Sequence, residues 1–414
     1  MTHANQRRIV VGTLAAGLLT ASGCGSTSST GQLAAQTSPA GSYPAASGVR
    51  QLTPDVTAQL DTAIKQVMKE ANVPGVVVGL WIPPNGSYVR AFGVADKSTK
   101  APMATDFYTR IGSVTKTFTV TGILQLVDQG KIGLDDPISK YISGVPSGDQ
   151  ITLRELAGMR SGLYNYTFDS GFQKAFFTDP SKPFTPQQLL AYAFKHPLVF
   201  KPGTQFEYVN TNLILLGLVV EKISGQPLHT YIQQHILTPS SLSHTVFPTG
   251  AEFPSPHAHG YTNQTLDGKV ADATNWNPSW GWAAGAMISN LNDLKAWAPI
   301  LATGSLLKPA TQAQRLKGSE LGSDTYGLGI FTAGGWIGHN GSLPGYQTLV
   351  FYLPSAKATM ILFDNTDTSY EGHEPSTLFG NAITKIITPG NVYALPAQPD
   401  APSSTPTTSA SPGG

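Results

Sequence analysis

Segments typical of β-strands lie near both ends of this chain, and segments typical of helices lie between them. Runs rich in Val, Ile, Leu, Phe and Tyr predict strands at 76–82, 88–94, 335–339, 346–353 and 359–363. Apolar residues at helical spacing predict helices at 54–71, 114–129, 186–195, 213–223 and 375–386. Because strands come first and last, the order predicts one discontinuous α/β fold that carries a helical insert.

The composition changes towards both ends and bounds the folded part of the chain. Residues 25–50 are rich in Ser, Thr, Ala and Gly, and the last residues are rich in Pro, Ser and Thr, with no apolar period in either stretch. The predicted organisation is a signal peptide at 1–23, a disordered tether at 24–50, an α/β domain at 51–135 and 276–392, a mainly helical domain at 136–275 and a disordered tail at 393–414.

The first residues predict export from the cytoplasm. Arg7 and Arg8 precede an apolar segment at 9–21 that ends in small residues and is too short for a membrane span. The sequence Ala21-Ser-Gly-Cys24 resembles a bacterial lipobox, which implies cleavage before Cys24 and lipidation of that residue. The expected location is therefore extracytoplasmic, on the cell membrane through a lipid anchor. Secretion after a plain signal peptide is the alternative.

Charge and missing motifs exclude several classes of function. The 26 Lys and Arg against 25 Asp and Glu give a net charge of +1, which does not build the basic field that nucleic-acid binding needs. The chain has no G-x-S-x-G, no H-E-x-x-H, no P-loop and no G-x-G-x-x-G after a strand. His257 and His259 lack further ligands nearby and predict a surface loop. We expect no nucleic-acid partner, no metal and no cofactor.

Ser113 and Lys116 form the first candidate pair for chemistry. They start a predicted helix, where residues three positions apart share one face. A lysine that is partly desolvated there can lose its proton and activate the serine hydroxyl as a nucleophile. Ser305 and Lys308 repeat the spacing, but Pro309 follows that lysine, so no helix runs through the pair. A role for Ser113 as a simple helix cap stays open at this point.

Tyr208 and Asn210 are the second candidate pair, and they lead into the apolar helix predicted from residue 213. A tyrosine can relay protons, and an asparagine can orient a lysine and a substrate amide. Tyr261 and Asn263 repeat this spacing in a predicted polar loop.

His339 and Gly341 form the third candidate pair, in the one H-x-G sequence of the chain, predicted at the end of a strand. Glycine at 341 would let a substrate lie along the strand edge, because no side chain blocks that approach.

In order and context these motifs resemble the serine β-lactamases and low-molecular-weight penicillin-binding proteins of the class C type. This family includes D-Ala-D-Ala carboxypeptidases, D-aminopeptidases and esterases. The resemblance covers about residues 52–388 and includes matching stretches at 109–118, 126–137, 161–163, 285–289 and 326–329. It implies a β-lactamase/transpeptidase-like α/β fold, in which a central, mainly antiparallel sheet is flanked by helices and a helical domain is inserted.

The resemblance also implies catalytic roles. Ser113 would be the acylated nucleophile and Lys116 its base or proton partner. Tyr208 would protonate the leaving group and help to activate water.

Substrate positioning is implied in the same way. Asn210 and Gly341 would position the substrate, and His339 takes the place of the lysine or histidine of the third motif. The backbone N–H groups of Ser113 and Ser342 would form the oxyanion hole.

Departures from the family pattern bear on the substrate. Val209 stands where serine is usual, and Asn340 stands where threonine or serine is usual. Histidine at 339 removes a permanent charge that would grip a β-lactam carboxylate, which favours the peptidase and esterase branch. The expected reaction is amide or ester hydrolysis through an acyl-enzyme, with a D-alanyl-D-alanine stem peptide of peptidoglycan as the first substrate. β-Lactam hydrolysis, small-ester hydrolysis and a non-catalytic scaffold remain alternatives.

Overall fold

The computed structural model describes residues 48–321 and 324–395. The predicted signal peptide, Cys24 and most of the predicted tether and tail lie outside the described residues. Its longer helices are α1 (Pro54–Glu70), α2 (Thr115–Asp128), α4 (Ser170–Thr178), α5 (Pro186–Ala193), α6 (Asn210–Ser224), α9 (Leu291–Thr303), α10 (Pro309–Leu316) and α11 (Pro375–Ile387). Its shorter helices are α3 (Leu153–Ala157), α7 (Leu228–Ile232) and α8 (Trp282–Gly285). None of the described helices is both long enough and apolar enough to cross a membrane.

One large sheet joins the two ends of the chain. Its eight strands follow the order β2-β1-β12-β11-β10-β9-β8-β7, and every neighbouring pair is antiparallel. The strands are β1 (Gly75–Ile82), β2 (Gly86–Gly93), β7 (Ser319–Leu321), β8 (Asp324–Tyr326), β9 (Phe331–Ala333), β10 (Trp336–Leu343), β11 (Tyr346–Leu353) and β12 (Ala358–Asp364). Two small sheets pair β3 (Tyr108–Arg110) with β6 (Ile288–Asn290), and β4 (Tyr261–Thr262) with β5 (Ala271–Asp272). The expected central antiparallel sheet is therefore confirmed.

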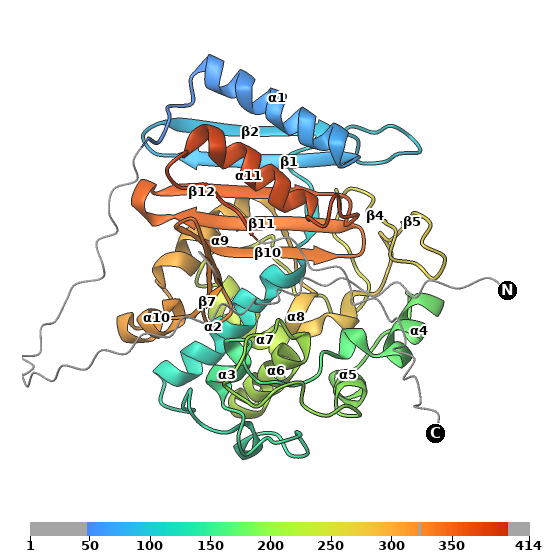
Figure 1. Cartoon of the computed structure of the whole chain (residues 1–414), viewed down its shortest axis with the longest axis vertical. Coiled ribbons are helices and arrows are strands. Elements are labelled where there is room, and N and C mark those ends of the chain that lie inside the picture. The colour runs from blue at the N-terminus through green and yellow to red at the C-terminus, as the bar shows by residue number, and fades with distance from the viewer. Residues whose placement is uncertain (1–47, 322–323, 396–414) are drawn as a thin grey trace, which may run out of the picture.

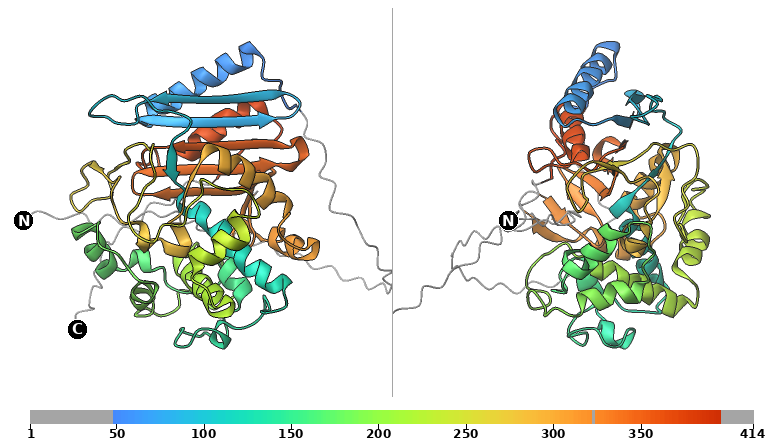
Figure 2. Two further views of the ribbon diagram at one scale, coloured as in Figure 1. Left: turned by 180° about the vertical axis from the view of Figure 1, so that it is seen from behind. Right: turned by 90° about the vertical axis from the view of Figure 1, so that its right-hand side faces the viewer.

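Helices cover both faces of the sheet, and a mainly helical region lies below it (Figure 1). Helices α1 and α11 pack together on one face, and α9 contacts β11 and β12 from the other face (Figure 2). Helix α1 buries Val56, Leu60, Ile64 and Val67, the apolar stripe expected from its spacing. The division into two domains stays a prediction.

Helix α2 is the structural centre of the molecule and differs from its prediction. Its sequence suggested one apolar face, but all of residues 115–124 are buried, so every side of the helix packs against protein. Several of its threonines are poor helix formers, and their hydroxyls bond to partners outside the helix. Thr119 bonds to Ala283 O at 2.8 Å, and Trp297 donates to Thr117 at 2.9 Å. Tertiary contacts therefore hold α2 in place.

Some predicted boundaries were wrong. The third motif lies within β10 and not at the end of a strand, because the strand continues to Leu343. Tyr261 lies in the two-residue strand β4 and not in a polar loop. The predicted tail begins too early, since Tyr393 is fully buried and packs against Phe351 with ring centroids 4.8 Å apart. The predicted tether ends too late, since Arg50 N already bonds to Ile387 O.

Candidate active site

Ser113 lies in a short 3-10 turn, Gly112–Val114, that leads directly into α2. Its side chain is almost buried, and its hydroxyl oxygen is 2.8 Å from Lys116 Nζ. No side chain caps the start of α2, where Val114 is the capping residue. The serine therefore does not serve as a helix cap, and its hydroxyl is paired with the lysine.

Lys116 is fully buried, and burial lowers the pKa of its amine well below the usual range. Its Nζ also donates to Ala284 O at 2.8 Å, which fixes the amine beside Ser113. None of the ion pairs in the described ranges involves Lys116. A neutral amine with no counter-ion has a lone pair that can accept the serine proton.

Tyr208 precedes α6 and is 3% exposed. Burial raises the pKa of its phenol well above the usual range, and nearby Ser113 offsets only part of that rise. The hydroxyl has no hydrogen-bond partner of normal geometry among the described residues, and Lys116 Nζ lies 4.8 Å from the ring centroid. Tyr208 is therefore a protonated group beside the nucleophile, able to donate.

His339 lies in β10 behind this pair and is fully buried. Burial, and then the nearby Lys116, lower the pKa of His339 to about 3, so the ring is neutral at physiological pH. Its Nδ1 bonds to Asn340 O, which leaves Nε2 as the lone-pair nitrogen, without a partner in the described part of the chain. The ring centroids of His339 and Tyr208 are 6.1 Å apart. The tyrosine thus has a neutral acceptor nearby.

Two glycines let β10 approach the serine turn. A Cβ on Gly341 would lie 2.0 Å from Ile111 O and 3.1 Å from the backbone nitrogen of Ser113. A Cβ on Gly112 would lie 2.7 Å from the backbone nitrogen of Ser342, and Gly112 also has a positive φ of 50°. Contact between two backbone segments therefore requires both glycines, and access for substrate along the strand edge, the reason expected for Gly341, stays a prediction. This contact brings together the N–H groups expected to form the oxyanion hole.

The edge of β10 beside Ser113 is open. Strand β9 pairs only with residues 336–338 of β10, so residues 339–343 have no strand neighbour on that side within the described residues. Leu343 and Tyr346 close a two-residue turn, and ladder bonds alternate along an antiparallel pair, so the N–H of Ser342 points away from β11. A peptide-like substrate can add there as a further strand.

Asn210 is the first residue of α6 and is 1% exposed. It was expected to orient Lys116, but the described residues contain no hydrogen bond between the two side chains, and the Ala284 carbonyl bonds to the lysine instead. The amide nitrogen of Asn210 has no partner in the described ranges. It is therefore available to a substrate carbonyl.

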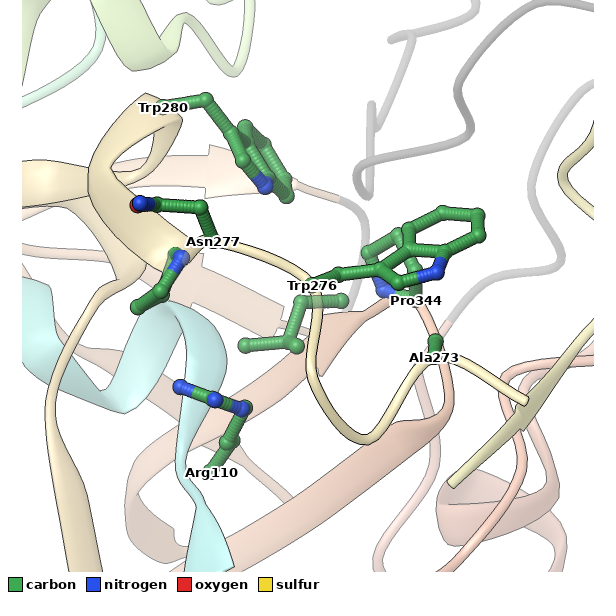
Figure 3. Close-up of a pocket in the computed structure, with 8 residues that line it drawn as sticks. Arg110, Ala273, Trp276, Asn277, Trp280 and Pro344 are labelled. Atoms are coloured by element: carbon green, nitrogen blue, oxygen red, sulfur yellow. The ribbon is translucent and has the colours of Figure 1, made fainter. Parts of the chain in front are cut away.

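A small pocket adjoins this site and is shown in Figure 3. Arg110, Trp276, Trp280, Leu343 and Pro344 line it, and its volume is about 10 Å³, room for roughly one water molecule. Arg110 comes three residues before Ser113, and Leu343 directly follows Ser342. The pocket therefore lies at the Leu343 end of the open strand edge.

Sequence reasoning missed two groups at this site. The Ala284 carbonyl, which bonds to Lys116, is a backbone atom and leaves no signal in residue type. Glu374 is 5% exposed and accepts a hydrogen bond from Asn340 Nδ2 at 2.8 Å. Glu374 comes directly before a predicted helix, where acidic residues are common. The sequence therefore gave no sign that Glu374 contacts Asn340.

The sequence repeats of the motifs lie elsewhere. Ser305 and Lys308 are exposed, and Lys308 Nζ bonds to Asp128 O at 2.6 Å. Tyr261 accepts from the backbone of Lys97 at 2.8 Å. His259 pairs with Asp272 at 2.6 Å. Across residues 48–321 and 324–395, no group of three His, Cys, Asp or Glu side chains is arranged to hold a metal ion.

Comparison with known proteins agrees with this geometry. The family model described as Beta-lactamase matches residues 60–379. The Bacillus subtilis (strain 168) protein named "Putative penicillin-binding protein PbpX" is 27% identical over 317 residues, which cover 75% of this chain and 75% of that protein. Protein flp of Staphylococcus aureus (strain MW2) is 26% identical over 77% of this chain, which spans 65% of flp.

Two solved structures resemble the fold closely. The D-stereospecific amidohydrolase from Streptomyces sp. has a TM-score of 0.72 and 29% identity, covering 80% of this chain and 98% of that one. The D-amino acid amidase from Ochrobactrum anthropi SV3, complexed with D-phenylalanine, has a TM-score of 0.69 and 26% identity, covering 80% and 99%. The chain belongs to the beta-lactamase family and is a serine hydrolase of the beta-lactamase and penicillin-binding-protein type.

Proposed function

We propose that the protein hydrolyses amide bonds that follow a D-amino acid residue, through an acyl-enzyme on Ser113. The observation that carries the proposal is the 2.8 Å contact between the Ser113 hydroxyl and a fully buried Lys116 amine, beside an open strand edge. Two structural relatives, a D-stereospecific amidohydrolase and a D-amino acid amidase, favour amide hydrolysis over ester hydrolysis.

In the acylation step, Ser113 Oγ bonds to the substrate carbonyl carbon and its proton passes to Lys116. The backbone N–H groups of Ser113 and Ser342 stabilise the oxyanion; losing one such donor typically costs about 3 kcal/mol of transition-state stabilisation. The C–N bond then breaks. The leaving nitrogen takes a proton from Tyr208, and the proton on Lys116 replaces it.

In the second step, water attacks the ester carbon and gives its proton to the same pair of residues. The bond to Ser113 Oγ breaks, and the serine recovers its proton. Asn210 would hold the substrate carbonyl on the acyl side through its free amide nitrogen. His339 Nε2 would accept from the Tyr208 hydroxyl and keep it oriented.

A D-alanyl-D-alanine peptide is the second candidate substrate, because a penicillin-binding protein is among the relatives and such a peptide has the same D-configured acyl residue. Both candidates use the same acylation chemistry. They differ in the group that leaves: ammonia for a simple amide and D-alanine for the peptide.

Intact-mass spectrometry of purified protein tests the proposal. Incubation with D-phenylalaninamide should add an acyl mass that depends on Ser113, and incubation with L-phenylalaninamide should add much less. The variant Ser113→Ala should abolish turnover of the D-amide, and the matched control Ser305→Ala should leave it unchanged. Turnover that survives Ser113→Ala, or equal turnover of both enantiomers, would contradict the proposal.

We also propose that the chain is exported and anchored by a lipid on Cys24, on the basis of its lipobox-like sequence. Metabolic labelling with a palmitate analogue should mark the full-length protein and not the variant Cys24→Ala. Equal labelling of both would contradict the anchor, and release of an unlabelled wild-type protein into the medium would match a plain export signal.

A further inference from the structure

Glu374 is a buried carboxylate that the mechanism above does not use. It precedes α11, is 5% exposed and accepts from Asn340 Nδ2 at 2.8 Å. None of the ion pairs formed within residues 48–321 and 324–395 includes it.

The alternation of side chains along β10 places Glu374 on the side of the strand opposite the serine turn. Gly341 faces Ile111 and Ser113, as its missing Cβ shows. Asn340 and Ser342 project to the other face. There Asn340 bonds to Glu374, and the Ser342 side chain also lowers the pKa of that carboxyl. The carboxylate thus contacts the side chains of Asn340 and Ser342, two residues of the stretch of β10 that has the open edge.

The direction of the substrate follows from Tyr208. This residue packs near His339, with ring centroids 6.1 Å apart, and it protonates the leaving nitrogen in the proposed mechanism. The leaving group therefore lies towards the His339 and Asn340 end of the edge. The acyl side lies towards Leu343 and the small pocket of Figure 3.

Acidic groups act on Glu374 at the leaving-group end, and the buried Arg315 is a cation whose charge acts on His339 there. His339 is neutral there, whereas a lysine would bring a positive charge. Asp364, Asp367 and Tyr208 are buried and are the other titratable groups whose charges interact with Glu374. Burial, with Asp367 nearby, raises the pKa of Glu374 to about 7, so keeping this carboxylate destabilises the fold at neutral pH. Glu374 is buried at a cost in stability, and it contacts Asn340 of the third motif. We therefore ask which substrates this carboxylate would select.

We propose that Glu374, held against Asn340, selects substrates by the charge of the leaving group: neutral amide leaving groups are accepted, and leaving groups that carry an α-carboxylate are rejected. The inference rests on the proposed function and narrows it. It places simple D-amino acid amides and carboxamide-capped peptides ahead of peptides with a free C-terminal D-residue, and ahead of β-lactams, whose carboxylate sits beside the leaving nitrogen.

A matched pair of dipeptides tests the proposal. D-phenylalanyl-glycinamide and D-phenylalanyl-glycine differ only in the charge of the leaving group, and cleavage of either at the peptide bond releases D-phenylalanine. For the wild-type protein we expect kcat/KM to be at least about tenfold higher for the glycinamide, the size of repulsion between two charges several Å apart near a protein surface.

Two variants show whether Glu374 is the cause. In Glu374→Gln the preference should fall below about threefold, through a gain for the glycine substrate. Glu371→Gln removes the same charge from an exposed position in the same loop and should keep the preference. In the wild-type protein the ratio of kcat/KM for the glycinamide dipeptide to kcat/KM for the glycine dipeptide should also fall as the pH is lowered from 8 to 5. Over that range Glu374 and its neighbour Asp367 take up protons, while His339 stays neutral.

The outcomes separate this inference from the proposed function. Equal kcat/KM for both dipeptides in the wild-type protein would overturn the role of Glu374, while the proposed acyl-enzyme mechanism would still stand. This comparison uses the wild-type protein alone, so it does not depend on whether a variant folds. An unchanged preference in a folded Glu374→Gln protein would overturn it as well. Failure of Ser113 to acylate with any D-amide would instead overturn the proposed function.

Discussion

The sequence Ser-x-x-Lys occurs at 113–116 and at 305–308, and the structure gives the two copies opposite environments. Lys116 is fully buried between Ser113 and the carbonyl of Ala284, which lies 168 residues further along the chain. Lys308 is exposed and bonds to Asp128. Burial lowers the pKa of the Lys116 amine well below its usual range, whereas the Lys308 amine lies at the surface. The spacing is shared, but the chemistry depends on segments far away in the sequence.

The two Tyr-x-Asn copies differ in the same way. The Tyr208 hydroxyl is buried without a partner in the described part of the chain. Tyr261 is partly exposed; its hydroxyl accepts from Lys97 N, and Lys97 Nζ lies 4.9 Å from its ring centroid. A buried group with unused hydrogen-bonding capacity can act on a substrate, whereas Tyr261 already has protein partners.

The largest expected effect separates the two lysines. Lys116→Met should lower the rate of Ser113 acylation by about 10³- to 10⁴-fold, because it removes the group that accepts the serine proton. Stopped-flow or quenched-flow mass spectrometry with D-phenylalaninamide measures this rate. The amine is buried without a counter-ion, so the thioether should fit and the melting temperature should not fall.

Lys308→Met is the control for this experiment and should acylate at the wild-type rate. If both variants kept that rate, Lys116 would not be the base, and the comparison of the two Ser-x-x-Lys copies would carry no functional meaning.

The next effect separates the two tyrosines. Tyr208→Phe should lower kcat for a D-amide by about 10²- to 10³-fold, because the leaving nitrogen loses its proton donor. Tyr261→Phe should leave kcat unchanged. A substrate whose leaving group needs no proton, such as a nitrophenyl ester, should lose much less in Tyr208→Phe. An equal loss for ester and amide would assign Tyr208 to another step.

Much of the fold could be predicted because its pattern is local. Strand β11 has the bounds predicted for it, and α1 buries the expected stripe. The three-residue strands β7, β8 and β9 were missed because so short a run shows no alternation. Helix α9 was missed as well, and it contains Pro299, which interrupts a helical pattern.

Residue type and spacing predicted which residues form the candidate site, but not their environment. Ser113, Lys116, Tyr208 and His339 were predicted, and the structure brings them together. Their protonation states were not predictable, since these depend on burial by segments remote in sequence. Glu374 was missed because its partner Asn340 lies 34 positions away.

The smallest expected effect compares two glutamates of one loop, buried Glu374 and exposed Glu371. In the folded chain the pKa of Glu374 is raised from 4.5 to about 7, so the folded state binds a proton more tightly than the unfolded state. The stability contributed by that proton is present below pH 4.5 and is lost as pH rises to about 7.

Glu374→Gln should therefore raise the free energy of unfolding at pH 8 by about 1–3 kcal/mol and change it little at pH 4. Glu371→Gln should stay within about 0.5 kcal/mol of the wild type at both pH values. Denaturant titrations at the two pH values measure the difference. Loss of stability in Glu374→Gln at pH 8 would mean that the negative charge strengthens the hydrogen bonds to Glu374 by more than its burial costs, and the carboxylate would then need no functional reason to be there.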